Sequence, residues 1–293
     1  MTLPNFLVIG AAKAGTTSVY EYLGQHPQIF MSPAKETFYF LPESSYSIDF
    51  DTYQSLFDGV SEEIAIGEAT PMYLHSPEAC QRIQQLIPNA KLIAVLRDPV
   101  DRAYSNYLDR LYDGRESITD FHQACEAEKA RRSTNIEAFA FYKSQGFYFA
   151  QLSHYLKAFD RSQIKILLFD DLKLEPEAFM QDIYRFLGVD ADFTPDLAIR
   201  RNTAGKNRHF ASSRKHEAIL KKLRILKPIT RRLIPDRLHR KAASKVGGLV
   251  RQNVSQKMPP LTAALRAELI SMYRDDILRL QDLINRDLSS WLR

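Results

Sequence analysis

The chain is 293 residues long and 45% of them are hydrophobic, which is enough for an extensive buried core and argues against a disordered chain. Its two cysteines, Cys80 and Cys125, are too few for a disulfide framework and too isolated for a zinc site, so we expect a reducing compartment. The first apolar run starts at residue 6 and no apolar stretch is long enough to cross a bilayer, so we expect a soluble, cytoplasmic protein.

The formal net charge is +5, but the positive charge is concentrated in one segment. Residues 200–257 contain 18 lysines and arginines and only two acidic residues, Glu217 and Asp236. Such a segment attracts phosphate-rich ligands, acidic carrier proteins, nucleic acid or an anionic membrane surface, and the sequence does not choose among them. A solvated basic helix face explains the charges equally well.

Short apolar runs alternate with helical patterns through the first two thirds of the chain. The runs are residues 6–9, 64–66, 92–96 and 164–169, and helices are predicted to begin near Thr17, Pro77, Pro99 and Gly146. The last of these helices carries Phe149, Leu152, Leu156 and Phe159 at helical spacing. Continuous apolar strands with helical crossovers indicate a doubly wound α/β fold, a P-loop-like parallel sheet flanked by helices.

The pattern changes after Gly188. A polar loop and basic helical stretches broken by Pro228 and Pro235 precede a helix whose apolar stripe is Leu265, Leu269, Met272, Tyr273, Ile277, Leu280, Leu283 and Ile284. We therefore predict one domain over 1–293: an α/β core at 1–199, a basic loop and helical segment at 200–260, and a C-terminal helix at 261–293 that packs on the core.

The first strand runs directly into a turn of small residues, Gly10-Ala-Ala-Lys-Ala-Gly-Thr-Thr-Ser18. A strand, a tight turn and a helix start leave backbone N–H groups directed at an anion, with Lys13 beside it. The phosphate-binding loop of nucleoside triphosphatases places its lysine where this chain has Thr16, so the two loops differ. A strand-to-helix turn that binds nothing is the alternative.

A second strand-to-helix junction places Arg97 directly after the run at 92–96, Pro99 at the start of the next helix, and Ser105 two turns along it. Both side chains are expected at the carboxyl edge of the sheet, where they could bind a second phosphate. The alternative is that Arg97 only pairs with Asp98 or Asp101.

Together the two junctions resemble the cofactor motifs of sulfotransferases that use 3′-phosphoadenosine 5′-phosphosulfate (PAPS). Within that family the chain resembles the branch related to heparan sulfate sulfotransferases, and it looks like a soluble member of the bacterial type. Segments 32–40, 67–71, 169–172 and 286–292 extend the likeness in the same order along the chain. The resemblance implies that the 5′-phosphosulfate is held by Lys13, Ala14, Gly15, Thr16, Thr17 and Ser18. It implies that Arg97 and Ser105 hold the 3′-phosphate, and that PAP is the released product.

The same resemblance makes Glu36 the general base that takes the proton of the acceptor. Lys13 would be the electrostatic catalyst, because in-line sulfuryl transfer builds negative charge on the departing phosphate. No metal is expected. The alternative for Glu36 is a surface residue paired with Lys35.

The acceptor side is less well defined. The resemblance places Glu68, Thr70 and Tyr148 near the substrate, although Tyr148 is equally an ordinary core aromatic. Ala69 stands where the heparan sulfate branch has lysine, which argues against a long acidic polysaccharide. The acceptor is a hydroxyl or amine on a lipid, sugar, metabolite or carrier-protein-bound acyl chain. Lys206 and Arg208 are the candidates for closing over the 3′-phosphate.

Parts of the sequence are compatible with two other functions. An ATP-dependent kinase or NTPase is suggested by residues 166–171, which resemble a strand ending in a magnesium-binding acidic residue, but the lysine placement argues against it. A non-enzymatic basic scaffold ranks lower, because no aromatic platform for nucleic acid accompanies the charges. Nucleic acid is therefore not expected as a partner, while peripheral membrane contact stays open.

Overall fold

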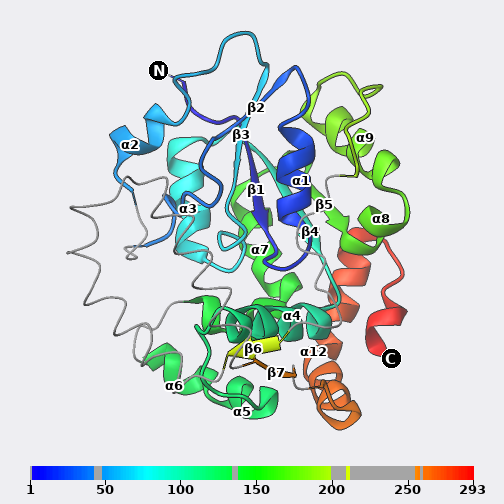
Figure 1. Ribbon diagram of the computed structural model, residues 1–293. Helices are drawn as coiled ribbons and strands as arrows, with labels where there is room; N and C mark the ends of the chain where they lie inside the picture. Colours follow the sequence, from blue (N-terminus) through cyan, green and yellow to red (C-terminus); the bar gives the residue numbers. More distant parts are fainter. Residues whose placement is uncertain (1, 43–47, 134–137, 199–208, 212–254, 258–259) are drawn as a thin grey trace, which may run out of the picture.

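The computed structural model describes residues 2–42, 48–133, 138–198, 209–211, 255–257 and 260–293 (Figure 1). Its centre is a parallel sheet with strand order β2-β3-β1-β4-β5. The strands are β1 (Phe6–Gly10), β2 (Ile29–Met31), β3 (Ala65–Ala69), β4 (Lys91–Leu96) and β5 (Ile164–Leu168). A separate antiparallel pair joins β6 (His209–Ala211) and β7 (Ser255–Lys257).

The predicted parallel sheet is confirmed by the pairing of its strands, and β1 and β4 are buried on both faces. All five residues of β1 are buried, as are the last five of β4. The run predicted at 64–66 begins one residue later and continues to Ala69, since Ile64 is 55% exposed. The edge strand β2 was not predicted, because three residues are too short to give an apolar pattern.

The α-helices of the described residues are α1 (Thr16–Leu23), α2 (Phe50–Ser55), α3 (Pro77–Leu86), α4 (Pro99–Tyr112), α5 (Phe121–Glu126), α6 (Glu128–Ser133), α7 (Tyr148–Ala158), α8 (Phe169–Leu174), α9 (Pro176–Leu187) and α12 (Ala263–Ile284). Helices α1, α3, α4, α7 and α12 begin close to the predicted positions, whereas the other five were not predicted. Proline at the first turn of α3, α4 and α9 favours these starts, because its fixed φ suits a helix and its missing N–H is not needed there.

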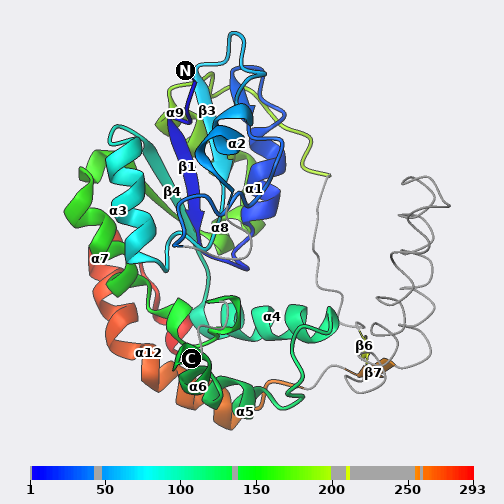
Figure 2. The same ribbon diagram turned by 90° about the vertical axis from the view of Figure 1, so that its left-hand side faces the viewer.

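The helices form layers on the two faces of the sheet (Figure 2). On one face α9 lies against α1, where the Tyr184 hydroxyl donates to the Tyr22 carbonyl at 3.5 Å. On the other face α7 packs against both α3 and α12. Helix α4 crosses beyond the carboxyl ends of the strands, so that β1 points toward it. This arrangement brings α4, which follows the second junction, to the turn between β1 and α1, where Lys13 pairs with Asp109 of α4.

The buried face of α7 differs in part from the prediction. The helix buries Leu152 as expected, but it also buries Tyr148 and Tyr155, whereas Phe149 and Leu156 are only half-buried. The tyrosines can take the core face because their hydroxyls find partners there; Tyr155 donates to the Tyr73 carbonyl at 2.7 Å.

The C-terminal helix α12 buries Leu265, Leu269, Tyr273, Ile277 and Leu280. These side chains belong to the predicted apolar stripe, and they face α7 and α4. Helix α12 also caps α7, because Asp276 accepts hydrogen bonds from the backbone N–H groups of Phe149 at 2.9 Å and Ala150 at 3.1 Å. Within the described ranges, none of the helices combines the length and apolar character that crossing a bilayer requires.

Candidate functional site

The turn between β1 and α1 requires glycine at residue 15. Gly15 has φ of +86°, a conformation that side chains rarely adopt, and a Cβ there would lie 2.9 Å from atoms of Phe169 and Leu172. Gly15 occupies the N-cap position of α1, and in the described part of the chain no side chain accepts a hydrogen bond at this cap. The first-turn N–H groups at the positive helix end are therefore available to an anion.

Lys13 lies in this turn and reaches toward α4. Its Nζ is 3.2 Å from Oδ1 of Asp109, and both side chains are partly exposed. Ala14 and Thr16 are buried, while Thr17 and Ser18 are half-buried at the start of α1. The turn therefore directs the Lys13 ammonium toward α4.

The two predicted junctions meet in the structure. Strands β1 and β4 are neighbours, and the Nη1 of Arg97 donates to the Lys13 carbonyl at 3.2 Å. The guanidinium also lies over the ring of Phe169, 5.2 Å from its centroid. The strand order reverses between β1 and β4, which is where doubly wound folds bind their ligands.

The alternative for Arg97 was that it only pairs with Asp98 or Asp101, and the structure shows one such contact, which is long. Its Nη2 is 4.0 Å from Oδ2 of Asp101, at the outer limit of an ion pair. Asp101 is instead bound by Arg266 of α12. Ser105 is half-buried one turn further along α4, so Asp101, Ser105 and Asp109 follow at intervals of four residues on one helix face.

Glu36 is placed beside this junction by the end of β3. Its backbone N–H donates to the carbonyl of Ala69, the last residue of β3, at 3.0 Å, and β3 is the neighbour of β1. Glu36 and Phe38 both have positive φ, at 65° and 56°, so the loop is sharply folded. The Lys35 partner named as an alternative is present, with its Nζ 2.6 Å from Oε1 of Glu36.

Glu68 forms a buried hydrogen-bond cluster beneath the Glu36 loop. The side chain is fully buried and accepts hydrogen bonds from hydroxyls of Thr70 at 2.7 Å, Tyr73 at 2.8 Å and Tyr53 at 3.2 Å. Tyr73 also contacts the Thr37 hydroxyl at 3.0 Å. Burial raises the pKa of the Glu68 carboxyl, and the hydroxyl donors oppose that rise.

The three residues predicted near the substrate are all fully buried. Glu68 and Thr70 are bonded to each other, and the Tyr148 hydroxyl donates to the Arg97 carbonyl at 2.9 Å. Tyr148 also packs edge-on against Trp291. Contact with an acceptor stays a prediction for these residues, and their contacts favour a role in holding the Arg97 and Glu36 segments. Lys206 and Arg208 lie outside the described residues.

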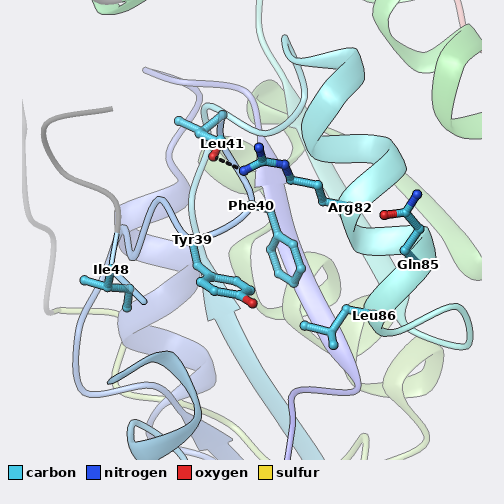
Figure 3. A pocket seen from close by; sticks show the side chains of 7 residues that line it. All are labelled: Tyr39, Phe40, Leu41, Ile48, Arg82, Gln85 and Leu86. Carbon is cyan, nitrogen blue, oxygen red and sulfur yellow. Dashed lines mark hydrogen bonds between the residues drawn. The ribbon is translucent and has the colours of Figure 1, made fainter. Parts of the chain in front are cut away.

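A cavity of about 530 Å³ opens between the Glu36 loop and the second half of α3 (Figure 3). Its wall consists of Tyr39, Phe40, Leu41, Ile48, Arg82, Gln85 and Leu86. Arg82 crosses it and donates to the Leu41 carbonyl at 2.7 Å. The wall contains no residue of the Lys13 and Arg97 junction, so the cavity is separate from that junction.

A group of possible metal ligands lies on the surface. His122, Glu126 and Glu268 place their ligand atoms within 4.8 Å of one another, and all three are exposed. Glu126 is already paired with Lys143 at 2.6 Å, and His122 with Glu268 at 3.6 Å. These contacts make the group an ion-pair network between α5 and α12.

Two residues of the junction were missed by the sequence analysis. Asp109 could have been found, because it is four residues after Ser105 on a predicted helix. Arg266 gave no local signal, since it is 165 residues from Asp101 along the chain. Its place beside the junction follows only from the packing of α12 against α4.

The chain belongs to the sulfotransferase family, because the model of the sulfotransferase domain matches residues 3–240. This membership does not support the kinase interpretation of the β1 turn. Asp171, one of the two acidic residues on which that interpretation depended, binds Arg286 through both carboxylate oxygens, at 2.9 and 3.0 Å.

Particular relatives agree with this assignment. Bifunctional heparan sulfate N-deacetylase/N-sulfotransferase 3 of Homo sapiens is 30% identical over 305 residues, covering 99% of this chain and 31% of that protein. The chain thus spans less than a third of that relative's length. Membrane-associated sulfotransferase kil1 of Dictyostelium discoideum is 27% identical over 270 residues, covering 65% of this chain and 57% of that protein.

A solved bacterial structure matches the whole fold. The sulfotransferase from Alicyclobacillus acidocaldarius superimposes with a TM-score of 0.76 at 32% identity, and the alignment covers 100% of both chains. The expected resemblance to sulfotransferases is therefore confirmed, and so is the P-loop-like α/β architecture.

Proposed function

We propose that the chain transfers a sulfuryl group from PAPS to a hydroxyl or amine acceptor. The observation that carries the proposal is the contact between the two junctions, in which Arg97 donates to the Lys13 carbonyl at 3.2 Å. Two cationic side chains and an uncapped helix start therefore converge where the strand order reverses. A bis-phosphorylated adenosine has two anionic ends: its 5′ end would bind at the helix start beside Lys13, and its 3′-phosphate would bind at Arg97.

The β1 turn would hold the 5′ end of the donor. The backbone amides of Gly15 to Ser18 and the hydroxyls of Thr16 and Thr17 would donate to the phosphosulfate. PAPS supplies an activated sulfuryl group, whose bond to the bridging phosphate oxygen breaks during transfer. Lys13 would neutralise the charge that grows on that oxygen, which requires its ammonium to turn from Asp109.

The β4 junction would hold the other end of the donor. Arg97 is fixed by the Lys13 carbonyl and the Phe169 ring, which leaves part of its fork of N–H groups for a phosphate. Ser105 lies on α4 two turns beyond Arg97 and would add a hydroxyl. The predicted closure by Lys206 and Arg208 belongs to the same proposal.

Glu36 would act as the general base. Its backbone N–H is bonded to the last residue of β3, the neighbour of β1, and its second carboxylate oxygen is not used by Lys35 in the contact at 2.6 Å. Glu36 would accept the proton of the acceptor while the acceptor oxygen or nitrogen forms the new bond to sulfur. The Glu68 cluster would keep the loop in place through Tyr73 and Thr37.

The charges around Lys13 favour an acceptor that is not a polyanion. Asp109, Asp101 and Glu36 carry carboxylates on this side, and Ala69 supplies no compensating lysine. The heparan sulfate relatives are named for an N-sulfotransferase activity, so an amine acceptor is tested beside hydroxyl acceptors.

Titration calorimetry with PAP, and separately with ATP and magnesium, tests the donor. We expect PAP to bind and ATP to bind more weakly; a preference for ATP would refute the proposal. Transfer of labelled sulfate from PAPS to a panel of acceptors tests the chemistry. Lys13→Ala should lower turnover by about 10²–10³-fold.

Glu36→Gln separates the base from the donor site. Loss of a general base costs about 10²–10⁴-fold in rate, and PAP affinity should stay within about twofold because Glu36 is assigned no contact with the nucleotide. Lys165→Ala is the matched control: this lysine pairs with Asp182 at 2.6 Å, at the opposite end of β5 from the site. Full activity in Glu36→Gln would remove Glu36 from the mechanism.

A further inference from the structure

Arg266 links the C-terminal helix to the first turn of α4. One of its terminal nitrogens binds Oδ1 of Asp101, and the other lies 3.8 Å from Oδ2 of Asp98. The side chain is 33% exposed, and Asp98 is only 14% exposed. One guanidinium thus faces two carboxylates, one directly after Arg97 and one four residues after it.

The Asp98 carboxylate stabilises the helix start, whereas neither carboxylate favours the binding of an anion. Asp98 is the N-cap of α4 and accepts the Asp101 N–H at 2.9 Å, which stabilises the helix start. Burial raises the pKa of Asp98, while the Asp101 N–H and the charge of Arg266 oppose that rise. The negative charges remain next to the residues assigned to the 3′-phosphate.

Asp101 lies between the two groups assigned to that phosphate. It is four residues after Arg97 and four before Ser105, so all three share one side of the helix start. Its Oδ2 is 4.0 Å from Arg97, whereas its other oxygen, Oδ1, is bound by Arg266. Without Arg266, the Asp101 carboxylate would be free to pair with Arg97 and to repel a phosphate.

We propose that Arg266 is a positioning residue for the donor site, which holds Asp101 and Asp98 so that Arg97 stays available to the 3′-phosphate. This inference rests on the proposed use of PAPS. It assigns to α12 a part in nucleotide selection, because Arg266 would favour ligands with a 3′-phosphate over those without one. Arg266 itself makes no contact with the nucleotide in this proposal.

The test is a double-mutant cycle on nucleotide affinity. PAP and AMP, which lacks the 3′-phosphate, are titrated into wild type, Arg266→Met, Asp101→Asn and the double variant at low salt. We expect Arg266→Met to weaken PAP by about five- to tenfold, as coupled charged neighbours commonly do, and AMP by less than about twofold because AMP has no 3′-phosphate. The double variant should recover most of the PAP affinity, because the competing carboxylate is gone.

Controls separate this role from a merely structural one. Lys165→Met removes the cation of an ion pair far from the site and should leave both affinities unchanged. Thermal unfolding checks the fold of each variant, and Arg266→Lys, which keeps the charge but not the fork, replaces Arg266→Met if the latter unfolds. The lysine variant should lose PAP affinity less strongly and be rescued by Asp101→Asn in the same way.

Each outcome decides the inference. A wild-type protein that binds no PAP overturns both the proposed donor and the role of Arg266. A wild type that binds PAP, with affinity unchanged in Arg266→Met, overturns the role of Arg266 alone. Equal loss of PAP and AMP without rescue by Asp101→Asn also overturns it, because a general disturbance of α4 would then explain the loss.

Discussion

Glu68→Gln tests the buried carboxylate that lies beneath the proposed base. Glu68 accepts hydroxyl hydrogen bonds at 2.7, 2.8 and 3.2 Å and is fully buried. Glutamine keeps the shape but turns one acceptor oxygen into an amide donor, so at least one hydroxyl loses its acceptor. A buried polar group left unsatisfied costs about 1–3 kcal/mol, and the remaining bonds weaken because they no longer involve a carboxylate.

We therefore expect Glu68→Gln to lower the free energy of unfolding by about 2–4 kcal/mol, which corresponds to a fall in Tm of roughly 5–10 °C for a chain of this size. Urea unfolding followed by circular dichroism measures the change. Glu62→Gln, which neutralises an exposed carboxylate in the loop before β3, is the control and should be silent. Equal stability of Glu68→Gln and wild type would show that the cluster does not hold this region.

The pH dependence has a defined sign. Burial raises the pKa of Glu68 in the folded protein above its unfolded value, so the unfolded chain releases its proton first as pH rises. The contribution of Glu68 is therefore fully present at low pH and is lost as pH rises through the folded pKa. Because glutamine does not titrate, the stability gap between wild type and Glu68→Gln should narrow from pH 4 toward pH 8.

Three further predictions concern the site and the core. Gly15→Ala should weaken PAP binding and lower Tm, because a Cβ would lie 2.9 Å from neighbouring side chains at φ of +86°, and calorimetry beside thermal unfolding would detect both; unchanged binding would argue against the cradle. Burial raises the thiol pKa of Cys80 to about 11 and that of Cys125 to about 12. Ellman's reagent should therefore modify both thiols slowly in the folded protein at pH 8 and rapidly in urea, and fast labelling of the folded protein would contradict this. Tyr148→Phe removes a donor to the Arg97 carbonyl and should lower the free energy of unfolding in urea by about 1 kcal/mol. A rise in KM for an acceptor at unchanged stability would instead support the predicted contact of Tyr148 with the substrate.

The sequence predicted those parts of the fold that depend on neighbours in the chain. Continuous apolar runs identified the strands, and Pro99 marked the start of α4, because both signals are local. The two junctions were predicted for the same reason, and the parallel pairing of β1 with β4 brought Lys13 and Arg97 together.

What the sequence did not predict depends on packing between distant segments. The hydroxyl cluster around Glu68 was not predicted, because it joins Tyr53 of α2 to Thr70 and Tyr73, which follow Glu68 in the chain. The helical spacing of α7 suggested Phe149 for the core, but the partner of Tyr155 on a distant loop decided the buried face. Arg266 likewise has no local signal, because only the docking of α12 brings it to Asp101.

The contacts of α12 also bear on how the protein matures during synthesis. Asp276 caps the start of α7, and Arg266 pairs with the start of α4, so two earlier helices are completed by side chains of α12. A nascent polypeptide synthesised only to residue 260 would contain every strand of the large sheet yet would lack both partners. The starts of α4 and α7 would then take their final form only after α12 has been made and has docked.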